Sequence, residues 1–349
     1  MWLNRNRRGI SLLAVLFLLL AGGLARADIT IVLQNGFIQQ YQRRVTIDTQ
    51  YTVDKAHAQP NPPNKDGDLH VAGRAEEVKL PIVAEIMNAA GEPAAVQTIH
   101  QVEGTGNPIA LSGAWRLWCE HGGTSQQIQG APLEPITTTN PEHVFEIHPI
   151  TRLQNRDLLP TLKPILGFQT KDAQESFTKY EGLRCRIIPG DDTTTLVTTM
   201  AGYNYVEFVM ELLAAPEPVE DGVFAFCKVL DLQGELLVHK RRMVMVKDSM
   251  VEQKTRNQPV GTRLHVLGLP RIDLSLVSWR VQAAANGNTE PLTWGLPYEI
   301  IVVGFYEYAP ADHIIPALFH ANGAKLPHTF IPRALTPKEL EKHKVPMEP

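Results

Sequence analysis

The chain has 349 residues and a formal net charge of −4, and 44% of its residues are hydrophobic, which is the composition of a globular protein long enough for two domains. The first 27 residues hold four arginines and no acidic residue, leaving 29 of the 33 basic residues against all 37 acidic ones. The resulting formal charge of −8 over residues 28–349 excludes a broad basic surface for nucleic acid or anionic lipid.

Residues 1–27 have the features of a cleavable secretory signal peptide. Three arginines precede an apolar run from Ile10 to Leu20 that is short for a membrane span, and Ala25-Arg26-Ala27 forms a small-x-small cleavage site. An uncleaved membrane anchor is the alternative. We therefore expect an exported protein, periplasmic or secreted, that begins near Asp28 and has no membrane span after cleavage.

Residues 28–155 are expected to form a small β-barrel domain. Short β-branched and aromatic runs alternate with turn residues, and five such runs in this length are typical of a small closed barrel. The predicted strands are 43–53, 68–72, 81–87, 110–120 and 143–153.

Residues 156–180 are predicted to be a linker ending in a short helix over Lys171–Tyr180. A second β-barrel-like domain is expected over 181–309, followed by a Pro-rich C-terminal tail over 310–349. The predicted strands of this second half are 183–188, 193–200, 205–212, 223–231, 236–246, 263–269, 277–283 and 298–308.

The two halves align loosely with each other, which suggests a duplication. The aligned segments are 111–113 with 266–268, Trp115-Arg116 with Trp279-Arg280, and 145–147 with 298–300. The sequence thus predicts a mainly β protein with two tandem small barrels and a short connecting helix.

Candidate chemical residues gather in the first barrel. Side chains alternate faces along a strand, so Asp68 and His70 project from one side, as do Glu146 and His148. If these strands are neighbours, the four side chains form a mixed nitrogen and oxygen site that suits zinc or another divalent transition metal, whereas calcium prefers oxygen alone. Glu85, in the strand between them, is the candidate general base. The alternative is a turn aspartate with ordinary surface histidines.

Three cysteines, Cys119, Cys185 and Cys227, occur at isolated positions without a CxxC pattern. Buried free thiols are favoured, and a disulfide between Cys185 and Cys227 is the alternative in an oxidising compartment.

The segments Asp66-Gly67-Asp68-Leu69-His70 and Glu146-Ile147-His148-Pro149 resemble a group of exported, mostly uncharacterised bacterial proteins with an OB-like barrel. This resemblance implies an OB-type barrel over Arg43–Leu153. A more distant similarity to staphylococcal-type nucleases implies calcium at the second aspartate of the turn, here Asp68. The Asp-Thr-Pro-Glu element of those nucleases is missing, and only Arg74 and Arg116 could clamp a phosphate.

Two hypotheses about function follow. The first is a cell-envelope binding or assembly module whose OB-like barrels hold an oligosaccharide, a nucleic acid or an envelope protein. The second is a divalent-metal-dependent hydrolase, similar to a phosphodiesterase or nuclease, that uses the Asp/Glu/His cluster and either zinc or calcium. Stacking platforms for the first hypothesis would come from Trp115, Trp118, Phe145, Tyr203, Tyr205, Trp279 and Trp294.

Overall fold

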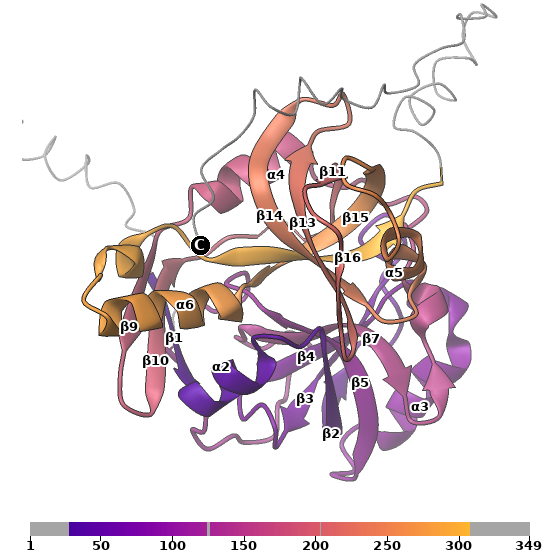
Figure 1. Cartoon of the computed structure of the whole chain (residues 1–349). Coiled ribbons are helices and arrows are strands. Elements are labelled where there is room, and N and C mark those ends of the chain that lie inside the picture. The colour runs from indigo at the N-terminus through magenta and orange to yellow at the C-terminus, as the bar shows by residue number, and fades with distance from the viewer. Residues whose placement is uncertain (1–27, 124–125, 203, 308–349) are drawn as a thin grey trace, which may run out of the picture.

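The computed structural model describes residues 28–123, 126–202 and 204–307. It is mainly β, with two closed five-stranded barrels and a separate four-stranded sheet, so the predicted fold class is confirmed (Figure 1). The predicted signal peptide and the whole of the Pro-rich tail over 310–349 lie outside the described residues. Within those residues, no helix has the length and apolar character needed to cross a membrane.

The first barrel has the strand order of an OB fold. Neighbouring strands pair antiparallel at every position but one. The exception is the pairing of the third strand, β4, with the fifth, β7, which is parallel and closes the barrel. The helix α3 (Pro93–Val102) follows the 3-10 turn η1 (Ala89–Gly91) between the third and fourth strands. The five strands are β2 (Thr46–Ala56), β3 (Leu69–Ala75), β4 (Ile82–Ile86), β5 (Pro108–Leu117) and β7 (Phe145–Leu153), and β8 (Arg156–Asp157) extends β7 at its edge.

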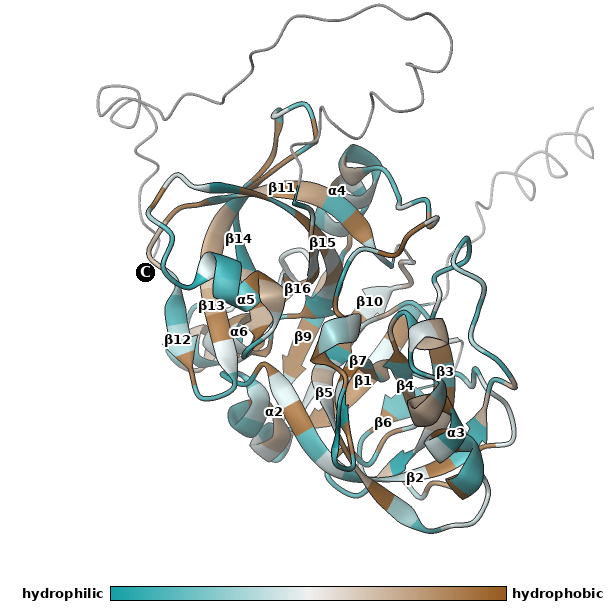
Figure 2. Cartoon of the chain, turned by 90° about the vertical axis from the view of Figure 1, so that its right-hand side faces the viewer, coloured by the Kyte–Doolittle hydropathy of each residue, from teal (hydrophilic) through white to brown (hydrophobic). Residues whose placement is uncertain are grey.

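The second barrel repeats this arrangement. Its third and fifth strands, β14 and β16, again pair parallel, and a short helix α5 (Met250–Thr255) again separates the third strand from the fourth. Hydrophobic and hydrophilic residues alternate along strands of both barrels (Figure 2), as expected for strands with one face in a core. The strands are β11 (Val206–Leu212), β13 (Gly222–Leu230), β14 (Leu236–Val246), β15 (Arg263–Ile272) and β16 (Tyr298–Phe305), and β12 (Glu217–Val219) pairs with β13.

Two strands predicted for the second barrel belong to a different sheet. β9 (Cys185–Pro189) and β10 (Thr193–Thr199) pair with β1 (Asp28–Gln34) and β6 (Gln126–Ile128) in the order β6-β1-β10-β9. The predicted membership of 183–188 and 193–200 in the second barrel is therefore wrong, because an alternating pattern predicts a strand but does not specify its partner. The helix α2 (Asn35–Tyr41) leads from β1 into the first barrel.

The predicted strand over 277–283 is wrong, because this segment lies in the helix α6 (Leu274–Ala285). The Asp273 side chain caps the helix by accepting from the backbone N–H of Leu276, and the buried residues Leu274, Val277 and Arg280 recur every three positions. α6 and the 3-10 turn η3 (Glu290–Thr293) contact β9 at one side of the molecule.

The linker contains the expected short helix, α4 (Ala173–Glu181), after a 3-10 turn η2 (Leu159–Thr161). Asp172 caps α4 by accepting from the backbone N–H of Glu175. Phe177 and Tyr180, three positions apart, are buried in the main core.

The barrels contact each other through reciprocal arginines. Arg116 on β5 donates from Nε to the carbonyl of Pro270 at 2.9 Å, and Arg271 on β15 donates from Nη1 to the carbonyl of Trp115 at 2.9 Å. Each arginine thus donates to the residue that immediately precedes the other arginine, since Pro270 precedes Arg271 and Trp115 precedes Arg116. Such self-complementary contacts are those of a twofold interface and support the duplication, with Arg271 rather than Arg280 as the counterpart of Arg116.

Candidate functional site

The Asp/Glu/His residues singled out in the sequence lie together on the outer face of the first barrel. Residues between them, such as Leu69, Ala84 and Ile147, belong to the main core, so strand alternation turns the polar side chains outward. His70 on β3 is the direct neighbour of Glu85 on β4, and the parallel pairing of β4 with β7 brings in the last strand. All five predicted site residues meet there: Asp68, His70, Glu85, Glu146 and His148.

The imidazole of His148 is the centre of this cluster. Its Nε2 lies 3.3 Å from Oδ2 of Asp68, and its Nδ1 lies 3.6 Å from Oε2 of Glu85 and 3.3 Å from Oε2 of Glu146. His70 contacts the cluster through Nε2, which is 3.3 Å from Oε2 of Glu85. One ligand atom each from Asp68, Glu85 and His148 lie within 4.8 Å of one another, a spacing that could hold a metal ion.

A residue of the second barrel closes the cluster. The hydroxyl of Tyr205, immediately before β11, donates to Oδ2 of Asp68 at 2.5 Å and lies 2.7 Å from Nε2 of His148. Asp68, His148 and Tyr205 are each 0% exposed. Sequence reasoning considered Tyr205 only as a stacking platform, because nothing local relates it to a turn more than a hundred residues earlier.

Arg116 forms the other side of the cluster. It is fully buried and pairs with Glu146 and with Glu120, the latter at 3.2 Å. His143 lies next to this pair, with Nε2 3.5 Å from Oε1 of Glu146. Its ring stacks on His121 at 5.0 Å between centroids. His143 is 1% exposed, and its backbone N–H donates to the carbonyl of His121.

The electrostatics of the cluster depend on burial and on the pairing of opposite charges. Burial raises the pKa of Asp68 and of Glu85, although His148 offsets part of the effect. Burial alone would lower the pKa of His148, but Glu85 and Asp68 outweigh it and hold that pKa well above its usual value. Burial would also raise the pKa of Glu146, but Arg116 reverses this and holds the pKa well below its usual range. With no ion bound, the carboxylates of Glu85 and Asp68 therefore favour the protonated form of the His148 ring.

Several other predicted roles are not supported by the positions of the residues. Arg74 and Arg116 are both engaged in ion pairs, Arg74 with Asp54 through two hydrogen bonds of 2.8 Å. Among the proposed stacking platforms, Trp115, Trp118, Phe145 and Tyr205 are buried, and Tyr203 lies outside the described residues. Trp294 is 36% exposed and lies 6.2 Å from Trp279, ring to ring. The three cysteines are free and buried.

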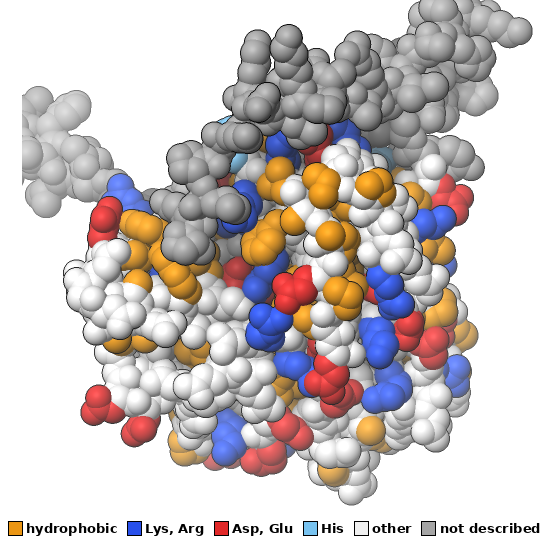
Figure 3. All heavy atoms as spheres, viewed as in Figure 1, with side chains coloured by type: hydrophobic (Ala, Val, Ile, Leu, Met, Phe, Trp, Pro, Cys, Tyr) orange, Lys and Arg blue, Asp and Glu red, His pale blue; other side chains and the backbone are white. Residues whose placement is uncertain are grey.

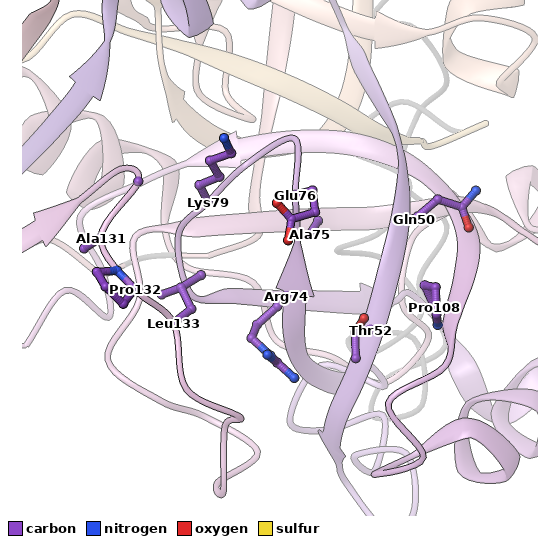
Figure 4. A pocket seen from close by; sticks show the side chains of 11 residues that line it. Gln50, Thr52, Arg74, Ala75, Glu76, Lys79, Pro108, Ala131, Pro132 and Leu133 are labelled. Atoms are coloured by element: carbon purple, nitrogen blue, oxygen red, sulfur yellow. The ribbon is translucent and has the colours of Figure 1, made fainter.

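A second site, which the sequence did not indicate, lies on the outer face of β2 and β3. It is a cavity of about 400 Å³ between these strands and the segment 130–133. Figure 4 shows Ala131, Pro132 and Leu133 on one side and Thr52 on the other, with Arg74 between them. Asp54 connects Arg74 to the chain that follows the segment 130–133. Its Oδ2 accepts from Nε of Arg74 and, at 3.1 Å, from the backbone N–H of Ile136.

Comparison with known proteins gives no relative: no family model matches the chain, and no curated protein is significantly similar to it.

Proposed function

We propose that the protein is an exported binding module whose ligand is a neutral, hydroxyl-rich polymer such as an oligosaccharide. The observation that carries this proposal is the cavity on β2 and β3, because OB barrels commonly bind extended polymers on the face of their second and third strands and β3 is the second strand of this barrel. The functional surface is then separate from the buried Asp/Glu/His cluster.

The lining of the cavity supports a polar but uncharged ligand. Gln50 and Thr52 offer an amide and a hydroxyl, which pair with sugar hydroxyls. The cations Arg74 and Lys79 are accompanied by Glu76 and by Asp54, the ion-pair partner of Arg74, so no net positive field attracts a phosphate backbone. The face in Figure 3 likewise intersperses basic and acidic side chains.

Isothermal titration with soluble neutral oligosaccharides, such as β-1,4-linked hexoses and N-acetylhexosamines, tests the proposal. Thr52→Trp fills the cavity and should weaken binding at least tenfold, whereas Thr195→Trp on β10 should leave it unchanged. A single-stranded oligonucleotide provides the comparison for a charged polymer. Failure of every neutral oligosaccharide to bind, or unchanged binding by Thr52→Trp, would contradict the proposal.

A metal-dependent hydrolase is the second candidate, and the convergence of Asp68, Glu85 and His148 favours it. Burial weighs against it, because Glu85 is 4% exposed and the two other residues are fully buried, which leaves a substrate no contact with them in this conformation. EDTA-sensitive cleavage of a phosphodiester that is lost in Asp68→Ala would establish the hydrolase instead of the binding module.

A further inference from the structure

The buried cluster carries more negative charge than its permanent cation can balance. Asp68, Glu85 and Glu146 are at most 4% exposed, and Arg116 compensates one of these three carboxylates. Unpaired charges are costly in a protein interior, so the remaining two must be protonated or balanced. A proton on His148, or a divalent cation in contact with both carboxylates, can supply this balancing charge.

Unsatisfied histidine nitrogens give a second, independent indication. Both ring nitrogens of His70 are buried without a hydrogen-bond partner. Buried polar atoms are nearly always hydrogen-bonded, so each exception calls for an explanation, of which ion binding is one. Nε2 of His70 points to Glu85, from which it is 3.3 Å away, and is therefore placed to bind an ion held by that carboxylate.

The second barrel shows that the fold does not need charges at these positions. Ala84 pairs with Ile147 as Met243 pairs with Ile300, so the following residue, Glu85, corresponds to Val244. By the same registers, His70 corresponds to Phe224 and His148 to Ile301. The residues Phe224, Val244 and Ile301 belong to an apolar cluster at the junction of the barrels. An apolar set fills the same place in the duplicate, so the polar set serves another purpose.

We propose that Asp68, Glu85 and His148 bind a divalent transition metal of the zinc class, with His70 as the fourth ligand. Two carboxylates and two imidazoles form the mixed donor set that zinc accepts in tetrahedral sites, whereas calcium requires six to eight oxygens. This site is independent of the cavity on β2 and β3 and of the ligand proposed there.

Tyr205 connects the metal site to the second barrel. Its hydroxyl contacts both Asp68 and His148, which makes it an outer partner that fixes the orientation of two ligands. Because Tyr205 immediately precedes the first strand of the second barrel, the metal stabilises the junction between the two barrels.

The experiment uses the full chain and zinc chloride as the probe. Elemental analysis gives the metal content, and thermal unfolding is followed with zinc, with calcium or with EDTA. We expect about one zinc per chain and a melting temperature that rises with zinc and falls with EDTA. Glu85→Gln should weaken zinc binding at least tenfold, and Tyr205→Phe about 10–100-fold. His239→Ala, at an exposed position, should bind zinc as the wild type does.

A graft of the apolar counterparts separates binding from folding. The triple variant His70→Phe, Glu85→Val and His148→Ile should fold, since the second barrel packs this set, and should lose the zinc-dependent rise in melting temperature. The proposal is overturned if the folded wild type takes up no stoichiometric zinc, if calcium stabilises it and zinc does not, or if Glu85→Gln retains full zinc affinity. None of these results affects the oligosaccharide titration.

Discussion

At the scale of single residues, the two barrels place a buried glutamate at equivalent positions and use arginines to keep it charged. Glu146 pairs with Arg116 across β5 and β7, and Glu299 pairs with Arg271 across β15 and β16. Arg242 also pairs with Glu299. Burial alone would raise the pKa of Glu299, but the two arginines lower it below its usual value. Such ion pairs are costly to break from one side, because the partner stays buried and uncompensated.

Glu299→Gln should therefore destabilise the protein at neutral pH by roughly 3–5 kcal/mol. Because the pKa of Glu299 is lowered on folding, its contribution is present above the unfolded value near 4.5 and is lost as the pH falls through the folded value. Urea unfolding between pH 3 and pH 7 should show a smaller acid loss in Glu299→Gln than in the wild type. Glu290→Gln, at an exposed site, is the control, and an equal acid loss in both variants would contradict the assignment.

At the scale of elements, a glycine allows the fourth and fifth strands of each barrel to approach closely. A Cβ at Gly113 would lie 2.4 Å from Cγ2 of Ile147, and a Cβ at Gly268 would lie 2.4 Å from Cγ2 of Ile300. Both glycines precede the interface arginine by three residues. The short motif Gly-x-x-Arg therefore combines close strand packing with the contact between barrels.

Gly113→Ala and Gly268→Ala should each destabilise the protein by about 1–3 kcal/mol, because the added methyl group overpacks a rigid core. Gly36→Ala in α2 is the matched control, since a Cβ there meets nothing within 4 Å. It should stabilise by about 0.5–1 kcal/mol, because alanine favours a helix over glycine. Chemical denaturation of the three variants checks this order, and equal effects at all three glycines would disprove it.

At the scale of the whole molecule, hydrogen bonds run between the barrels in both directions. Arg271 donates to the carbonyls of Arg44, Val45 and Trp115 in the first barrel and stacks on the Trp115 ring at 3.6 Å. In the opposite direction, Asp221 before β13 accepts from the backbone N–H groups of Val45 and Thr46. Interactions of each barrel with the other should therefore couple their unfolding.

Arg271→Lys should uncouple the barrels, because one ammonium cannot replace a planar guanidinium that bonds four oxygens and stacks on a ring. Calorimetry should show one two-state transition for the wild type and a lower, broadened or divided transition for the variant. Arg43→Lys, at an exposed pair with Glu217, should retain the single transition. A wild type that already unfolds in two steps would refute the coupling.

The sequence by itself determined the features that arise from local patterns. Alternating β-branched residues predicted most barrel strands, and the Asp68-x-His70 and Glu146-x-His148 spacings predicted which side chains share a face. Tertiary structure decided which strands are partners. The pairing of β1 with β10 and the parallel pairing of β4 with β7 join segments far apart in the chain, and no local pattern specifies such pairs. The burial of the cluster under Tyr205 was decided in the same way, because it results from the packing of one barrel against the other.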